Sequence, residues 1–136
     1  MEKKILVADG SDIDGRINAI VKPHAPTFVR TLDDATRALE RDGYDLIIIG
    51  VHFDESRMFD LLRQVRADER YRTKPVVCVV SQRFDRPISI EGLEIATRAL
   101  GADAFVDFAR HDDHEAGDAA IRGVVERLLA DPAPNA

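Results

Sequence analysis

The sequence predicts a doubly wound α/β domain, in which a five-stranded parallel sheet lies between two layers of helices. Short apolar runs of strand length alternate with segments whose apolar residues recur at helical spacing, and five such strand–helix units follow one another. Strict alternation favours parallel strands joined by helical crossovers. The central runs are apolar throughout, which is typical of strands that helices cover on both faces.

Five runs are expected to form the strands. The run at 46–49 consists of four large aliphatic residues and is the strongest indication of a buried strand. The other four runs lie at 5–8, 27–30, 75–80 and 104–106. Of these, 27–30 carries polar residues and is expected to be more exposed. Pro75 stands at the entry of its run, where a missing N–H group is tolerated.

Five helices are expected to follow these strands. Their apolar positions are Ile13, Ile17, Ile20 and Val21; Ala35, Ala38 and Leu39; Met58, Leu61, Leu62 and Val65; Leu93, Ala96 and Leu100; and Ile121, Val124, Val125 and Leu128. We expect Pro23, Gly43 and Gly101 to end the first, second and fourth helices. Thr31 and Asp33 are the N-cap candidates of the second helix.

Composition limits the classes of function. Hydrophobic residues make up 45% of the 136 residues, which is enough for the core of one domain and argues against global disorder. The formal net charge of −6 argues against nucleic-acid binding, because such binding depends on Lys and Arg at the phosphates. We expect one domain over 1–130 and a frayed tail at 131–136, whose prolines suggest that the chain ends there.

The expected location is the cytoplasm. Cys78 is the only cysteine, so an intrachain disulfide is excluded, and its valine neighbours predict inert packing inside a strand. The first residues lead directly into a strand-like run with no signal-peptide pattern. No apolar run approaches the roughly 20 residues that cross a bilayer, so we expect no membrane association.

Four stretches, at 4–9, 44–49, 75–77 and 101–105, occur in an order and at a spacing that resemble the receiver domains of two-component response regulators. The resemblance extends over roughly 3–130. It implies a flavodoxin-like three-layer fold with the strand order 2-1-3-4-5. Sites in such sheets form at the carboxyl ends of the strands.

The resemblance also implies a chemistry, which is phosphoryl transfer from a histidine kinase to an aspartate at the end of the third strand. The carboxylate acts as nucleophile. An acidic pair after the first strand holds Mg²⁺. A hydroxyl residue ending the fourth strand and a lysine ending the fifth contact the phosphoryl group, where positive charge neutralises its oxygens.

This chain departs from that pattern at nearly every position. The corresponding positions are Asp9 and Gly10 for the acidic pair, Gly50 for the acceptor, Val80 with Ser81 beside it for the hydroxyl, and Phe108 for the lysine. Gly50 has no side chain to phosphorylate, and a one-residue gap would be needed to bring Ser81 into place. No lysine occurs from residue 101 onward. Phe105 does match, at the aromatic switch position of the family.

These losses predict a degenerate receiver, or pseudo-receiver, that acts in bacterial signalling as a phosphorylation-independent, non-enzymatic protein-interaction module. The expected docking surface is the face of the fourth helix, fifth strand and fifth helix, at about 90–129, and a homodimer is one candidate assembly. We expect no metal or other cofactor. The alternative is small-ligand sensing in the vacated pocket at the sheet edge. A flavodoxin-like enzyme ranks lowest, since no nucleophile–base pair or cofactor motif is present.

Several polar residues near this edge have two interpretations. Asp9 forms a metal site with Asp12 or Asp54, or else it simply ends a strand while Asp12 caps the first helix. Asp54 is a substitute acceptor or a solvated turn residue. His52 is a ligand or phosphorylation site, or an exposed loop histidine.

Two loops near the expected site also have more than one interpretation. His111 and His114, with the acids between and after them, suggest a metal cluster or else a polar loop leading into the last helix. In the loop at 82–89, Phe84 or Ile88 forms a lid over an apolar floor, or the segment is a surface loop. The residues expected to build that floor are Gly50, Val80 and Phe108.

Overall fold

A computed structural model of the chain describes residues 3–10, 14–55, 57–80, 89–108 and 114–130, with side chains from residue 117 onward in the last helix. The strands are β1 (Lys4–Ala8), β2 (Ala25–Val29), β3 (Leu46–Gly50), β4 (Val76–Val80) and β5 (Ala104–Asp107). The helices are α1 (Asp14–Val21), α2 (Leu32–Arg41), α3 (Met58–Ala67), α4 (Ile90–Ala99) and α5 (His114–Ala130).

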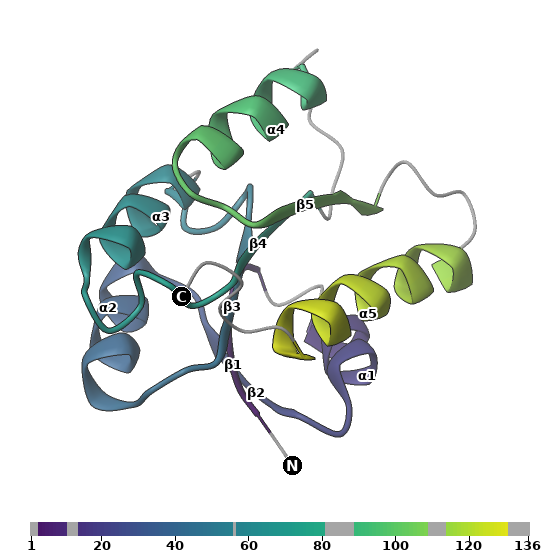
Figure 1. Ribbon diagram of the computed structural model, residues 1–136, viewed down its shortest axis with the longest axis horizontal. Helices are drawn as coiled ribbons and strands as arrows, with labels where there is room; N and C mark the ends of the chain where they lie inside the picture. The colour runs from purple at the N-terminus through teal and green to yellow at the C-terminus, as the bar shows by residue number, and fades with distance from the viewer. Residues whose placement is uncertain (1–2, 11–13, 56, 81–88, 109–113, 131–136) are drawn as a thin grey trace.

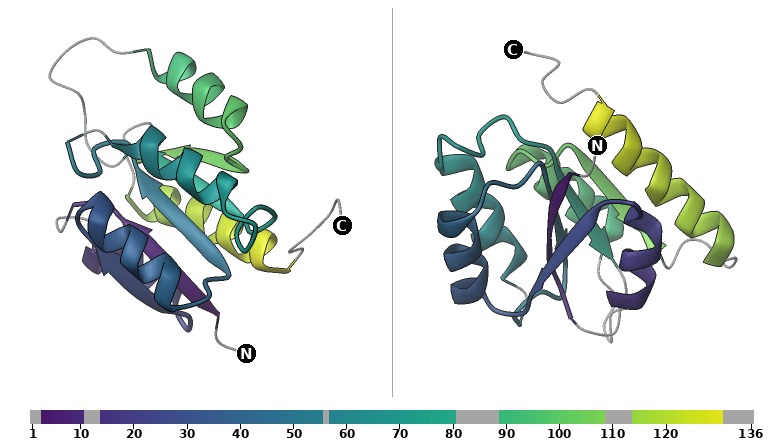
Figure 2. Two further views of the ribbon diagram at one scale, coloured as in Figure 1. Left: turned by 90° about the vertical axis from the view of Figure 1, so that its left-hand side faces the viewer. Right: turned by 90° about the horizontal axis from the view of Figure 1, so that it is seen from below.

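The strands form one parallel sheet in the order β2-β1-β3-β4-β5, with β3 at its centre (Figure 1). Helices α2, α3 and α4 lie on one face of this sheet, and α1 and α5 lie on the other (Figures 1 and 2). The predicted fold class and strand order are therefore confirmed.

Two apolar clusters, one on each face of the sheet, hold the layers together. Because side chains alternate along a strand, β3 contributes to both: Ile47 and Ile49 pack on the α2–α3 side, and Leu46 and Ile48 pack on the α1–α5 side. We call these the α2–α3 cluster and the α1–α5 cluster. All five residues of β3 are buried, as expected for a central strand of a doubly wound sheet.

Helix α2 follows its sequence pattern closely. Thr31 is the N-cap, and its hydroxyl accepts a hydrogen bond of 3.1 Å from the backbone N–H of Asp34. The buried face consists of Ala35, Ala38 and Leu39, which are the three positions that the spacing predicts. Asp33, the other N-cap candidate, instead lies in the first helical turn, where its negative charge is favourable.

Two boundaries become definite only in the structure. Strand β2 begins at Ala25 instead of Thr27, because it pairs with β1 along its whole length and Pro26 is tolerated on an edge strand. Helix α5 begins at His114, within the polar segment that was expected to lead into the last helix. Acidic and polar residues are favoured in a first helical turn, so a polar composition does not mark a loop there.

Helix α4 is the least deeply packed of the helices whose burial the structure describes. Thr97 is its one fully buried residue, and the predicted apolar residues Leu93, Ala96 and Leu100 are only partly buried. Ile95 is 63% exposed.

Within the described residues, no helix is both long and apolar enough to cross a membrane. The predicted tail at 131–136 lies outside the described residues.

Candidate functional site

The carboxyl edge of the sheet brings the first and third strands together at the expected acceptor position. Ala8 of β1 is in register with Ile49 of β3, so the next residues, Asp9 and Gly50, follow side by side. Gly50 is also in register with Val79 of β4. The three central strands therefore meet around Gly50, at the edge where parallel sheets form their sites.

The carboxyl group of Asp9 lies directly over Gly50. A Cβ atom added to Gly50 would lie 2.0 Å from Asp9 Cγ, 2.1 Å from Oδ2 and 2.3 Å from Oδ1, all far inside van der Waals contact. Asp9 is only 3% exposed. Its Oδ1 accepts a hydrogen bond of 2.8 Å from the backbone N–H of Gly10. The space that an acceptor side chain would need is thus already filled.

Arginine side chains brace the segment around Asp9. Arg30, which follows β2, donates from Nη1 to the carbonyl oxygen of Asp9 at 2.9 Å, and its Nη2 pairs with the carboxylate of Asp14 in α1. The sequence analysis did not assign Arg30 or Asp14 any role. The position of Arg30 after the strand next to β1 would have been the signal, because it places a long cation at the same sheet edge.

The residues that the structure describes at this edge do not by themselves supply a magnesium site. Mg²⁺ is bound through carboxylate oxygens and requires near-ideal octahedral geometry. Asp9 supplies one carboxylate, but Gly10 and Gly50 supply none, and the Asp9 carboxyl group is directed over Gly50. Within the described ranges, no group of three or more His, Cys, Asp or Glu side chains is placed to hold a metal ion. Asp12, the proposed partner of Asp9, lies outside them.

Asp54 has a role that neither sequence interpretation included. It adopts a left-handed backbone conformation, with φ of 43°, and is followed by Glu55 with φ of 56°. Its Oδ2 accepts a hydrogen bond of 2.8 Å from the backbone N–H of Leu32, the first residue of α2. Asp54 therefore ties the β3–α3 connection to the start of α2, where a negative charge is favourable. Its carboxylate is turned toward α2, so Asp54 is not a simple solvated turn residue.

His52 is partly buried in the same connection, so the description of an exposed loop histidine is wrong. It stands between two buried residues, Val51 and Phe53. The backbone N–H of Val51 continues the sheet by donating to Val79 at 2.9 Å, and the N–H of Phe53 closes a turn onto Gly50 at 3.0 Å. The segment after Gly50 is thereby fixed to the sheet.

At the expected lysine position the chain has Phe108, which is 3% exposed. The guanidinium of Arg16, from α1, lies 4.1 Å from the centre of the Phe108 ring, a distance that favours a cation–π interaction. Arg16 Nε also pairs with Asp118 of α5. This position is therefore part of the packing between α1 and α5, and its neighbouring cation already has a carboxylate partner.

The predicted apolar floor does not form. Val80 packs in the α2–α3 cluster, whereas Phe108 packs in the α1–α5 cluster on the other face of the sheet. Gly50 lies under the Asp9 carboxyl group. Phe105, at the aromatic switch position, is partly buried against the α2–α3 cluster. The other residues tied to this edge, Ser81, Phe84, Ile88 and His111, lie outside the described residues.

Cys78 is fully buried in β4. Burial raises the pKa of its thiol to about 12, because the charged thiolate would lose its hydration, and the charge of Arg66 offsets only a small part of this. The thiol therefore stays protonated at neutral pH. This agrees with the packing role that its valine neighbours predict.

Comparisons with known proteins agree on the fold. Neither the protein-family models nor the curated proteins include a match to this chain. Solved structures do match. The receiver domain of a signal transduction histidine kinase from Syntrophus aciditrophicus is 22% identical, with a TM-score of 0.74, over 98% of this chain and 95% of that chain. The fold is that of a receiver domain.

Two further receiver structures are similar over nearly their whole length. The phosphorylated cyanobacterial phytochrome response regulator RcpA is 18% identical, with a TM-score of 0.74, over 98% of this chain and 97% of that chain. The receiver domain of the sensor histidine kinase PA1611 from Pseudomonas aeruginosa, which has a magnesium ion in its active-site cleft, is 18% identical. Its TM-score is 0.72, over 96% of this chain and 99% of that chain. At these identities the likeness establishes the fold.

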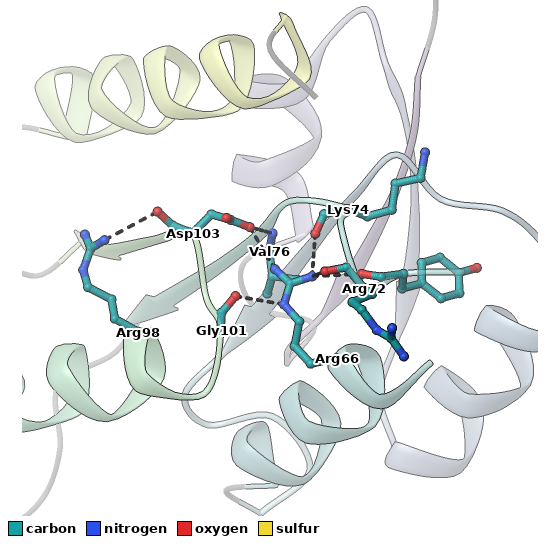
Figure 3. Close-up of polar contacts among 8 residues, drawn as sticks. Arg66, Arg72, Lys74, Val76, Arg98, Gly101 and Asp103 are labelled. Atoms are coloured by element: carbon teal, nitrogen blue, oxygen red, sulfur yellow. Dashed lines mark hydrogen bonds and ion pairs between the residues drawn. The ribbon is translucent and has the colours of Figure 1, made fainter. Parts of the chain in front are cut away.

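The amino edge of the sheet carries a network centred on Arg66 of α3 (Figure 3). Its Nε donates to the carbonyl of Gly101 at 2.9 Å, and Nη2 pairs with Oδ2 of Asp103 at 2.9 Å. Its Nη1 faces three carbonyl oxygens of the α3–β4 connection, those of Tyr71, Arg72 and Lys74, at 2.9, 3.1 and 2.7 Å. Sequence reasoning missed this residue, which joins α3 to both neighbouring connections.

A hollow of about 370 Å³ lies at the same amino edge. It is lined by Glu40, Arg41, Asp42, Gly43, Tyr44, Asp45, Arg70, Tyr71 and Lys74. Its three acidic residues balance its three basic residues, and Arg70 is further paired with Asp68 at 2.9 Å. The hollow thus offers no net charge to attract an ionic ligand, and we assign no site to it.

Proposed function

We propose that this chain is a receiver-like domain of bacterial two-component signalling that works as a protein-interaction module and does not use aspartyl phosphorylation. One observation carries the proposal. At the edge where a receiver takes up its phosphoryl group, position 50 has no side chain, and the carboxyl group of Asp9 fills the space above it.

The surrounding residues support the same proposal. Phosphoryl transfer to a protein needs a nucleophile and positive charge on the transferred oxygens. Gly50 offers no nucleophile, and Phe108 stands where a lysine would supply charge. Arg16, whose guanidinium lies over that ring, is engaged with Asp118. These residues support a role without phosphoryl transfer, and we propose that this role is non-enzymatic.

The proposed docking surface is the face formed by α4, β5 and α5, at about 90–129. Strand β5 is the last strand of the sheet, so one side of it has no strand partner within the sheet. It lies between α4 and α5 (Figure 1). Helix α4 exposes Ile95 and buries only Thr97 completely, so its outer side is open to a protein partner or a second copy of this chain.

Small-ligand sensing, the alternative function, receives less support. It requires an open apolar pocket at the carboxyl edge. The Asp9 carboxyl group occupies the space over Gly50, and Val80 and Phe108 face different helical layers. A thermal-shift screen with nucleotides and metabolites would favour sensing if one compound raised the melting temperature in proportion to its concentration.

The proposal is tested by incubating the chain with acetyl phosphate and Mg²⁺ and measuring the mass of the intact protein. A response regulator with an acceptor aspartate, treated in parallel, shows that the donor is active. We expect no phosphoryl group on this chain. Acetyl phosphate can also acetylate lysine side chains, and the different mass of an acetyl group distinguishes that product. A phosphoryl group, stable or acid-labile, would refute the proposal, and peptide mapping would then separate His52 from Asp54 as its acceptor.

A further inference from the structure

We infer that Asp9 is a built-in occupant of the degenerate site: its carboxyl group takes the place of an acceptor side chain, so that any side chain at position 50 requires Asp9 to move. The inference rests on the proposed function only in taking this edge to be free of phosphoryl transfer. It adds a cause for the glycine.

The first step is that Gly50 is not needed for its backbone conformation. Gly50 is the last residue of β3, in register with Val79, and its φ is outside the left-handed range that side chains avoid. Glycine weakens a strand because it adds backbone entropy to the unfolded chain and buries no side chain. A glycine in a central strand is therefore explained by a close approach from another group.

The second step identifies that group as the carboxyl of Asp9. Its three terminal atoms lie 2.0 to 2.3 Å from the position of a Cβ on Gly50. Ordinary contacts of a Cβ begin near 3.4 Å, so any side chain at position 50 would force a movement of more than an ångström. Alanine and aspartate share this Cβ, and both meet the same obstacle.

The third step is that moving the Asp9 carboxyl group has a cost, because the group is buried and would lose its hydrogen bond from the N–H of Gly10, while the backbone that carries it is held in the sheet. Asp9 directly follows β1, which pairs with β2 on one side and β3 on the other. Its carboxylate accepts from the N–H of Gly10, and its carbonyl accepts from Arg30. The side chain is almost completely buried. A side chain at position 50 must therefore displace a buried, hydrogen-bonded carboxyl group.

Thermal unfolding of single and double variants tests the inference. Gly50→Ala is expected to lower the melting temperature by about 5–10 °C, because overpacking a rigid site is destabilising. In an Asp9→Ala background, which removes the three obstructing atoms, Gly50→Ala should cost less than about 2 °C. In an Asp9→Asn background, which keeps the shape but removes the charge, the loss should return in full.

Gly43→Ala is the matched control, since a Cβ there meets no atom within 4 Å. An equal loss from Gly50→Ala in the wild-type and Asp9→Ala backgrounds would overturn the inference, as would no loss in the wild type. If Gly50→Ala does not fold, the double variant decides: folding near the melting temperature of Asp9→Ala supports the inference, and failure to fold refutes it. Phosphorylation of the wild-type chain would refute the proposed function but leave this coupling intact.

Discussion

Replacing Arg66 by alanine is expected to destabilise the domain more than any exposed arginine substitution would. Arg66 is the common donor for the α3–β4 connection and for the turn that leads from α4 into β5. Its side chain is 18% exposed, whereas Arg98, which donates to the carbonyl oxygen of Asp103 at 3.5 Å, is 50% exposed. The prediction concerns the docking surface as well, because that turn sets where β5 begins.

The magnitude follows from the contacts that would be lost. Hydrogen bonds to charged groups contribute about 1.5–3 kcal/mol each, but bonds within one network are not additive. Asp103 would keep its bond of 2.8 Å from the backbone N–H of Val76, and the freed carbonyls at the surface can accept from water. We therefore expect Arg66→Ala to reduce the free energy of unfolding by about 2–4 kcal/mol in total.

Urea denaturation followed by circular dichroism measures this loss. Arg66→Lys should recover less than half of it, because one ammonium cannot reproduce the fork of the guanidinium. Arg98→Ala is the matched control; its partner Glu94 lies 3.2 Å away on an exposed helix face, and its loss should stay below about 1 kcal/mol. Equal effects of Arg66→Ala and Arg98→Ala would refute the reasoning.

Two further predictions concern Asp54 and Cys78. Asp54→Ala should cost about 1–2 kcal/mol of unfolding free energy, since it removes the acceptor for Leu32 and strains a left-handed residue, whereas Asp54→Asn, which keeps both features, should cost under about 0.5 kcal/mol; equal losses would contradict this role. The pKa of the Cys78 thiol is about 12 in the folded chain, which is above its value in the unfolded chain. The stability contributed by the buried, protonated thiol is therefore complete below the unfolded pKa and is lost as pH rises through the folded pKa. From about pH 8 to pH 10, wild type should therefore lose about 1–2 kcal/mol more stability than Cys78→Ala, and parallel losses in chemical denaturation would refute this assignment.

The sequence was sufficient to predict the layers of the fold, because the spacing of the apolar residues shows which faces of the strands and helices are buried. The four aliphatic residues at 46–49 admit few placements other than a strand covered on both faces. The spacing of Ala35, Ala38 and Leu39 likewise places one helix face on the sheet. At the start of α5 the pattern left the boundary open, because the polar residues after His114 suit a first helical turn as well as a loop.

The candidate site was only partly accessible to sequence reasoning. Correspondence with the receiver pattern located Asp9 and Gly50, but the direction of the Asp9 side chain depends on the register between β1 and β3. A glycine in an otherwise aliphatic strand, next to an acid that ends the neighbouring strand, was the available signal. The separation of Val80 from Phe108 was not foreseen, because it depends on which face of the sheet each side chain meets.

The contacts of Arg66 and Asp54 could not be predicted for a different reason. Each joins segments far apart in sequence, and Arg66 lies 35 residues from Gly101. Their partners are backbone groups, which every residue carries, so residue identity gives no indication of the pairing. A surface arginine on α3 and an acid in a turn have many other common roles.

The central claim, that this receiver-like domain works without aspartyl phosphorylation, is tested most directly by the intact mass of the wild-type chain after treatment with acetyl phosphate and Mg²⁺. Because Gly50 has no carboxylate and Asp9 covers its place, we expect the mass to show no phosphoryl group while a competent receiver in the same experiment gains one. A gain of one phosphoryl group by the wild-type chain would contradict the claim.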